Sequence, residues 1–327
     1  MNILEKITRA TLCSLAFFIT INASADVVYP DRPLRWVVGY PPGGGSDNLS
    51  RIVAVQFSKE LRQPVHIDNR PGASGIIASQ FVAKSPADGY TILDAGNGSL
   101  INNAELYQKI PYDPQASFAL VGQMARTGLL IIASPGSGIS NARSLLDLLK
   151  SSPGKINIAT PGKGTPHHLG LELFQSEVSA SMVHVPYKGG APAMQDIMGN
   201  QIPLMVVDVP SGLTAIKAGK VIPILALSAD RIPQLPDVPT SAELGYNAVN
   251  AYSWHGIVAP AGTPKNVMEQ LERNLNSSLK DEKTRKLLYE AGWDVQFLGA
   301  SDWRGYIDLE RKKWSALIRE KNIKIDQ

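Results

Sequence analysis

The sequence predicts an α/β fold of about two domains, and three observations lead to that prediction. Short apolar runs alternate with amphipathic helical patterns through residues 34–207, which indicates strands alternating with helices in largely parallel sheets. The length of 327 residues corresponds to two domains of roughly 150 residues each. Hydrophobic residues make up 44% and charged residues 19%, so the chain is globular rather than disordered.

The spacing of apolar residues places the elements in order. Strands are expected at residues 34–38, 65–67, 90–93, 129–133, 156–159, 182–185 and 204–207, and helices at 49–61, 74–83, 101–107, 140–150, 165–178 and 192–199. From residue 263 the chain is expected to be mostly helical. Thr263 is the expected N-cap of one helix, with Pro264 at its first position, and Ser301 is the expected N-cap of the last.

Residues 1–25 have the features of a cleavable signal peptide. Lys6 and Arg9 precede a short apolar run at 10–21, and residues 23–25 (ASA) form a small-x-small cleavage site. The run is shorter than the roughly 20 residues that a membrane-spanning helix needs, which argues against the alternative of an uncleaved anchor. We therefore expect an exported protein, located in a bacterial periplasm.

The cysteine content and the net charge exclude several classes of function. The single cysteine, Cys13, lies in the predicted signal peptide, so we expect no disulfide, thiolate nucleophile or Cys-ligated metal in the exported chain. The net charge of +3 is too small and too scattered to indicate nucleic-acid binding.

Three glycine-rich turns each follow a predicted strand and lead into a helix. They are residues 39–47 (GYPPGGGSD), 94–99 (DAGNGS) and 160–168 (TPGKGTPHH), and each is expected to end on a hydroxyl residue at the helix start. Glycine lets a ligand approach the backbone closely, and the first N–H groups of a helix have no partner within the helix. Such turns bind anions, and in α/β sheets they meet at the carboxyl ends of the strands. Each turn could simply cap a helix, but together the three favour a carboxylate site.

Catalytic and cofactor motifs are absent from the sequence. There is no phosphate-binding Walker loop, no dinucleotide glycine pattern and no G-x-S-x-G nucleophile elbow. His168 and Glu172 have the i, i+4 spacing of half a metal site, but no third ligand is nearby, so we expect no metal and no cofactor. Asp208 ends an apolar strand, and it is interpreted as an acceptor for a ligand N–H or hydroxyl group rather than as a general base.

The sequence resembles the Bug family (TctC-like), the periplasmic solute-binding proteins of tripartite tricarboxylate transporters. The resemblance covers nearly the whole chain after the signal peptide. Its motifs include residues 29–33 (YPDRP), 68–73 (DNRPGA), 87–91 (ADGYT), 162–169 (GKGTPHHL), 235–240 (LPDVPT) and 259–264 (APAGTP). The segment 183–193 (VHVPYKGGAPA) is the most specific of them.

The resemblance implies a type II periplasmic-binding-protein fold, in which two α/β domains close over a ligand cleft. Residues 26–128 and 254–327 would form the first domain and 129–253 the second, with hinges near 127–131 and 251–254. The ligand would be a carboxylate, held by backbone groups of the first and third turns and by bridging waters. The expected binding residues are Tyr40, Gly44, Gly45, Ser46, Asp47, Asn97, Ser99, Gly164, Thr165, His167, Asp208 and Tyr252.

The function predicted from the turns and the resemblance is solute capture by a non-enzymatic monomer that delivers its ligand to a membrane permease. A ligand sensor that signals to a receptor kinase is the alternative with the same fold, and a secreted hydrolase is a third. The first turn departs from the family pattern at residues 40–42 (YPP), and Val209 follows Asp208 where relatives often have Asn. Both departures leave the carboxylate open, and Tyr40, Tyr252 and Trp254 could accommodate an aromatic one.

Overall fold

The computed structural model describes residues 29–325, so the predicted signal peptide lies outside the described residues. Residues from Arg32 onward form one compact unit. No helix among residues 29–325 is long and apolar enough to cross a membrane. The strands are β1 (Leu34–Val38), β2 (Val65–Asn69), β3 (Thr91–Gly96), β4 (Phe118–Ala133), β5 (Asn157–Thr160), β6 (Val183–Pro186), β7 (Leu204–Asp208), β8 (Ile222–Ala226), β9 (Tyr252–Pro260) and β10 (Asp294–Gly299).

The helices alternate with these strands, as predicted. They are α2 (Gly45–Leu61), α3 (Ile76–Ala83), α4 (Asn103–Leu106), α5 (Ala142–Ser151), α6 (Pro166–Glu177), α7 (Gly190–Met198), α8 (Val209–Lys217), α9 (Lys265–Lys280), α10 (Glu282–Glu290) and α11 (Ala300–Glu320). Short 3-10 or π turns, η1 (Ala73–Gly75), η2 (Gly98–Asn102), η3 (Pro135–Ser137) and η4 (Ala242–Leu244), join some of them.

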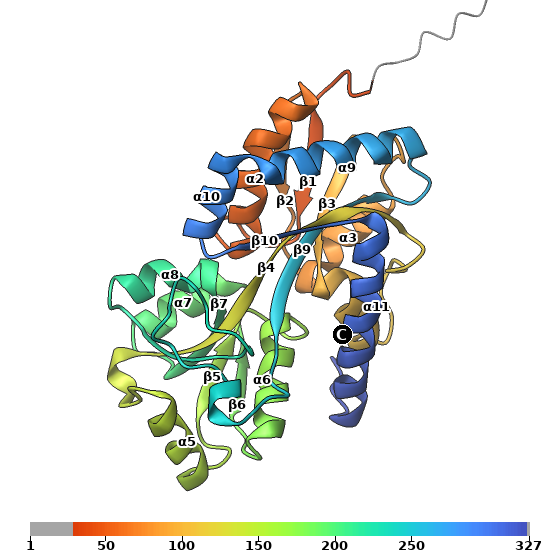
Figure 1. Ribbon diagram of the computed structural model, residues 1–327. Coiled ribbons are helices and arrows are strands. Elements are labelled where there is room, and N and C mark those ends of the chain that lie inside the picture. The colour runs from red at the N-terminus through yellow and green to blue at the C-terminus, as the bar shows by residue number, and fades with distance from the viewer. Residues whose placement is uncertain (1–28, 326–327) are drawn as a thin grey trace, which may run out of the picture. The chain divides into compact units, whose positions relative to one another are not determined.

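The strands pair in the order β2-β1-β3-β9-β4-β7-β5-β6, and β8 and β10 also pair with β4. Residues 118–128 of β4 pair with β9, whereas residues 129–133 pair with β7 and β8. The change of partner divides the strands into a first region (β1, β2, β3, β9, β10) and a second region (β5, β6, β7, β8), with β4 in both (Figure 1).

The prediction of largely parallel sheets is only partly correct. The βαβ pairs are parallel, namely β1 with β2 and β3, and β5 with β6 and β7. The pairs of β4 with β7, β8, β9 and β10, and of β3 with β9, are antiparallel. β8, β9 and β10 were not predicted, and β4 is longer than expected, because their pairing depends on long-range contacts rather than on a local pattern.

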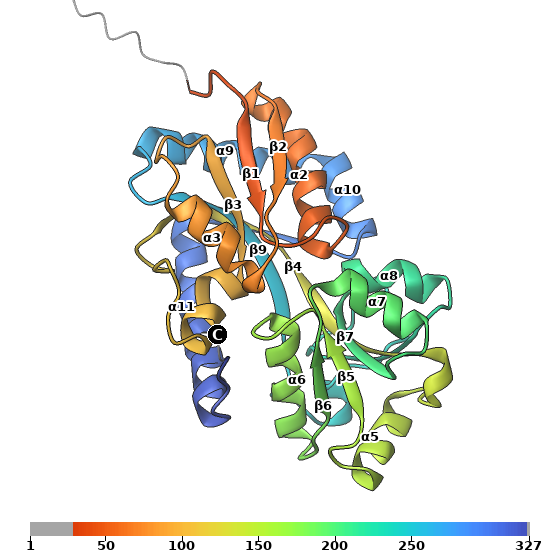
Figure 2. The same ribbon diagram turned by 180° about the vertical axis from the view of Figure 1, so that it is seen from behind.

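Both faces of the strands are covered. In the first region α2, α9 and α10 pack together on one face (Figure 1), and α3 lies on the other (Figure 2). In the second region alternate residues of β4 belong to two cores: Leu129 and Ile131 to one, Leu130 and Ile132 to the other. Strands buried on both faces are continuous apolar runs, which explains why residues 129–133 were recognisable in the sequence.

Two predicted N-caps are wrong. The α9 helix begins at Lys265 with Pro264 as its N-cap, and the Thr263 hydroxyl instead donates to the Pro260 carbonyl at 2.7 Å. The α11 helix begins at Ala300 with Gly299 as its N-cap, so Ser301 lies within its first turn. In α9 the Thr263 hydroxyl is already bonded to Pro260 and cannot cap the helix. In α11 Gly299, two positions before Ser301, has the extended backbone of an N-cap residue.

Gly305 offers a test of the α11 helix. It is exposed in the helix interior, and a Cβ atom added there would meet nothing within 4 Å. We expect Gly305→Ala to raise the free energy of unfolding by about 0.5–1 kcal/mol, because alanine loses less backbone entropy in a helix. Urea unfolding measures the change, and a destabilised variant would contradict this placement of Gly305.

Candidate functional site

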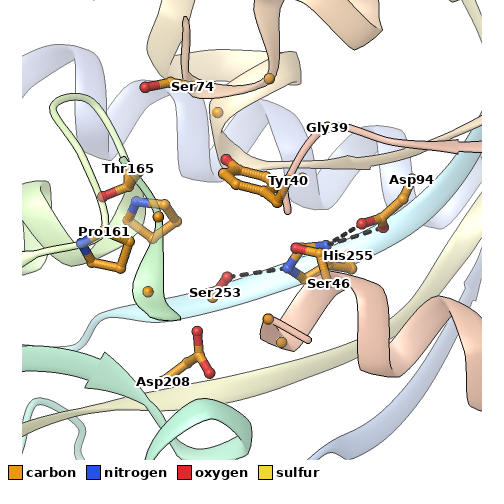
Figure 3. Close-up of a pocket in the computed structure, with 18 of the residues that line it drawn as sticks. Gly39, Tyr40, Ser46, Ser74, Asp94, Pro161, Thr165, Asp208, Ser253 and His255 are labelled. Atoms are coloured by element: carbon orange, nitrogen blue, oxygen red, sulfur yellow. Dashed lines mark hydrogen bonds and ion pairs between the residues drawn. The ribbon is translucent and has the colours of Figure 1, made fainter. Parts of the chain in front are cut away.

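A small cavity lies where the turns after several strands meet (Figure 3). Its lining comes from within residues 39–46 after β1, 74–79 of η1 and α3, 93–99 at the end of β3, 161–167 after β5, 189–191 at the start of α7, 208–211 at the end of β7 and start of α8, and 253–255 of β9. Its volume is about 70 Å³. A cavity of this size has room for more than a single buried water, and therefore for a small ligand.

The structure brings nine of the predicted binding residues to this cavity. They are Tyr40, Gly44, Gly45, Ser46, Asn97, Ser99, Thr165, His167 and Asp208. The three glycine-rich turns therefore converge, as their positions after strands suggested. Whether these residues bind a ligand stays a prediction.

Three predicted residues do not line the cavity, because other contacts hold them. Asp47 accepts from the Gly43 amide and from Arg51, both at 2.9 Å. The Gly164 carbonyl accepts from Asn102 at 3.0 Å. Tyr252 lies beneath the Arg126 guanidinium, 4.5 Å from the ring centroid, and lines a separate pocket.

The side chains of Asn97 and Ser99 face the cavity but are already bonded to the backbone. Asn97 accepts from the Trp254 amide at 3.1 Å and donates to the Tyr252 carbonyl at 3.3 Å. The Ser99 hydroxyl accepts from the Gly96 amide at 3.0 Å. Asn97 thus joins the β3 turn to β9, whereas Ser99, whose hydroxyl also donates to the Gly96 carbonyl at 3.2 Å, closes the turn itself.

Helix starts supply backbone donors around the cavity. The predicted hydroxyl cap occurs only at α6, where Thr165 accepts from the His168 amide. The N-cap of α2 is Gly44, without a side-chain cap, and Ser46 lies inside the helix. Two further helix starts line the cavity: α7, predicted as a helix at 192–199, begins at Gly190, and α8, which was not predicted, is capped by Asp208. These positive helix ends favour an anionic ligand.

Asp208 and His167 form a buried pair in the cavity wall. His167 Nε2 lies 3.2 Å from Asp208 Oδ2, and Asp208 Oδ1 accepts from the Ser211 amide at 2.8 Å. Burial acts to raise the pKa of Asp208, but the bonds and charge of His167 and the Ser211 bond outweigh it and hold that pKa below its usual range. His167 Nδ1 is buried without a partner among the described residues.

A second imidazole–carboxylate pair, not predicted from the sequence, lies on the opposite wall. His255 Nδ1 is 3.0 Å from Asp94 Oδ1, and His255 Nε2 is 3.3 Å from the Ser253 hydroxyl (Figure 3). The sequence signal was Ser253 and His255 at alternate positions, which face the same side of a strand. Asp94 could not be connected to them because the antiparallel pairing of β3 with β9 joins residues 161 apart.

The surroundings of His255 in this serine–histidine–aspartate array favour its protonated form. Burial acts to lower the pKa of His255, but the charge and hydrogen bond of Asp94, with the charge of Asp208, raise it above its usual range. A raised pKa extends the pH range over which His255 keeps its proton, and a triad histidine takes the proton of its serine only while it is neutral.

The histidines near α6 contact each other and a neighbouring carboxylate. His168 stacks on His184 with ring centroids 4.2 Å apart, and its Nε2 lies 3.6 Å from Glu172. Burial, with the nearby charges of His184 and Lys163, lowers the pKa of His168 to about 3. Among residues 29–325 no group of three or more His, Cys, Asp or Glu side chains could hold a metal ion.

Comparisons with known proteins identify the family of the chain. Residues 49–323 match the family described as the tripartite tricarboxylate transporter family receptor, TctC. The protein BugT of Bordetella pertussis is 32% identical over 308 residues, which is 94% of each chain. The periplasmic binding protein BugD has a TM-score of 0.85 at 32% identity, covering 90% of this chain and 99% of BugD. Rpa4515 of R. palustris, solved with adipate, has a TM-score of 0.86 at 30% identity, covering 89% and 97%.

The fold is therefore that of a periplasmic solute-binding protein, which confirms the predicted fold class. The chain belongs to the TctC family of tripartite tricarboxylate transporter receptors, as the sequence motifs suggested. Proteins of this family bind solutes and are not enzymes, and membership implies a periplasmic location.

Proposed function

We propose that this protein captures a small carboxylate, with a dicarboxylate as the first candidate, in the cavity between the β1, β3, β5 and β7 turns. The observation that carries the proposal is the convergence of helix starts on a cavity without lysine or arginine among its described lining residues. Three or four hydrogen bonds to a charged group, at roughly 1.5–3 kcal/mol each, suffice for micromolar binding. Adipate in Rpa4515 supports the same ligand class.

The binding residues that we propose are the nine at the cavity, with His167 Nδ1 as an additional partner. Asp208 would accept from a ligand hydroxyl or protonated carboxyl group, because a ligand carboxylate facing Asp208 directly would be repelled. The ligand is therefore proposed to point its carboxylates toward the helix starts and the imidazoles.

Capture is proposed to occur by closure of two domains, residues 26–128 with 254–327 and residues 129–253. The change of β4 partners between residues 128 and 129 supports this division. Contacts that join the two sides also support it, such as the Ser74 hydroxyl donating to the Lys163 carbonyl at 2.7 Å. The closed form, an exported monomer freed of residues 1–25, would then deliver the ligand to a membrane permease.

A thermal-shift screen tests the proposal. Protein purified from the periplasm is mixed with mono-, di- and tricarboxylates, aromatic carboxylates and uncharged amides. A ligand at 100 times its dissociation constant adds roughly 2.7 kcal/mol, about 5 °C or more in Tm. We expect a small dicarboxylate to shift Tm and its diamide not to. Stabilisation by uncharged or cationic solutes alone would contradict the proposal.

A further inference from the structure

Asp94, His255 and Ser253 form a hydrogen-bonded series at the cavity. These side chains do not belong to the helix starts, so the anion-binding role of the helix starts does not account for them. The Asp94 side chain is 1% exposed and that of His255 is 9% exposed, yet both residues and Ser253 line the cavity. They come from neighbouring strands, with Gly96 of β3 opposite His255 of β9. Gly96 brings the two backbones close, because a Cβ atom there would lie 2.6 Å from the Trp254 carbonyl. The array is thus built into the sheet and not into a loop.

The charged neighbours of His255 are few. Asp94 contacts it from β3, and Asp208 acts on it from the start of α8. Tyr40, after β1, interacts with Asp94, and burial, together with the Asp94 charge, raises the pKa of its hydroxyl, which therefore stays protonated. Trp293 packs edge-on against the imidazole at 5.4 Å, and the β4 residue paired with His255 is Ala125. Among the described residues Asp94 is therefore the carboxylate in contact with this ring, Asp208 adds a second negative charge, and no Lys or Arg lines the cavity.

The protonation of His255 decides which way the Ser253 hydroxyl points. When both ring nitrogens carry a proton, Nδ1 donates to Asp94 and Nε2 donates to Ser253, so the serine oxygen is an acceptor and its proton is free. When His255 is neutral with its proton on Nδ1, Nε2 must accept from Ser253 and the hydroxyl proton is no longer free. The cavity gains a donor only in the first state.

We propose, on the basis of the proposed function, that Asp94 holds His255 as an imidazolium so that Ser253 donates its proton to an anionic oxygen of the ligand. Ser253 and His255 are then the specificity-determining end of the cavity for the second carboxylate of a dicarboxylate. Asp94 is a positioning residue that acts through His255. A ligand with an amide in place of that carboxylate loses the attraction of the imidazolium.

The proposal has a defined pH dependence. His255 has a raised pKa in the folded protein, so the imidazolium is present at low pH and is lost as the pH rises through that pKa. Affinity for the dicarboxylate should fall over the same range. In Asp94→Asn His255 should lose its proton at a lower pH than in the wild type, so the affinity should begin to fall at a lower pH.

The test combines NMR titration of the histidines with calorimetric binding of succinate and adipate and of their monoamides, between about pH 5.5 and 9. The variants are Asp94→Asn, Ser253→Ala and, as a matched control, Asp308→Asn on α11, whose carboxylate binds only Arg311 among the interactions described for it. We expect the pKa of His255 to fall in Asp94→Asn alone. We expect Asp94→Asn and Ser253→Ala to lose about tenfold or more in diacid affinity at pH 7. The Asp94→Asn loss should shrink at pH 5.5, which a merely structural defect would not do.

Each other outcome overturns the inference in a recognisable way. If NMR shows that His255 of the wild type is neutral at pH 7, the inference is wrong, even if a dicarboxylate binds. A cationic His255 with unchanged affinity in Asp94→Asn and Ser253→Ala overturns the inference and leaves the proposed function standing. If neither diacid nor any other carboxylate binds the wild type, the proposed function fails and the inference fails with it.

Discussion

Gly45→Ala should weaken carboxylate binding about 5- to 150-fold while leaving the fold intact. A Cβ atom on Gly45 would lie 3.0 Å from Asp208 Oδ1, across the cavity from the start of α2. Asp208 cannot easily move away, because the Ser211 amide and His167 hold its two oxygens. Crowding of this kind costs about 1–3 kcal/mol. If the two domains separate in the absence of ligand, the added methyl group destabilises only the closed, ligand-bound form. That cost corresponds to the stated loss of affinity.

The measurement is calorimetric affinity for whichever carboxylate the thermal-shift screen identifies, together with urea unfolding of the free protein. Gly305→Ala is the control, since its added methyl group is remote from the cavity and meets nothing within 4 Å. A Gly45→Ala protein that binds as tightly as the wild type would show that Gly45 and Asp208 do not meet in the bound form. If Gly45→Ala lowers the free energy of unfolding of the ligand-free protein, then the added methyl group already crowds Asp208 in the absence of ligand.

The sequence revealed the parts of the site that local chemistry encodes. Glycine-rich turns after strands gave Gly44, Gly45, Thr165 and His167, because turn residues and helix starts leave a local signal. The sequence also led us to assign Tyr252 to this site, because its aromatic ring could accommodate an aromatic carboxylate. On a strand, however, alternate side chains point to opposite faces, and Tyr252 lies under Arg126 in a different pocket.

What could not be predicted depends on pairing between distant strands. Asp94 and His255 meet only because β9 returns antiparallel beside β3. β10 was missed for a related reason, since it is a partly buried strand that pairs irregularly with β4 and has no strict alternation of apolar residues. The resemblance to a known family supplied the fold where the pattern alone did not, but it did not indicate the second imidazole–carboxylate pair.

Gly256→Ala should lower the free energy of unfolding by about 3 kcal/mol, a large loss for one methyl group. Gly256 lies in β9 between Ala95 of β3 and Gln123 of β4. A Cβ atom there would lie 2.5 Å from the Gly122 carbonyl oxygen and 2.4 Å from the ring of Trp303, which is fully buried. Neither the central strand nor the buried indole can shift without disturbing its neighbours.

Urea unfolding of Gly256→Ala, of Trp303→Phe and of the double variant shows whether the indole of Trp303 or the carbonyl oxygen of Gly122 excludes the methyl group. If the indole is the main obstacle, the smaller ring should restore part of the stability, and the two substitutions will be non-additive. If the Gly122 carbonyl dominates, the losses will simply add. A single Gly256→Ala variant as stable as the wild type would contradict this packing.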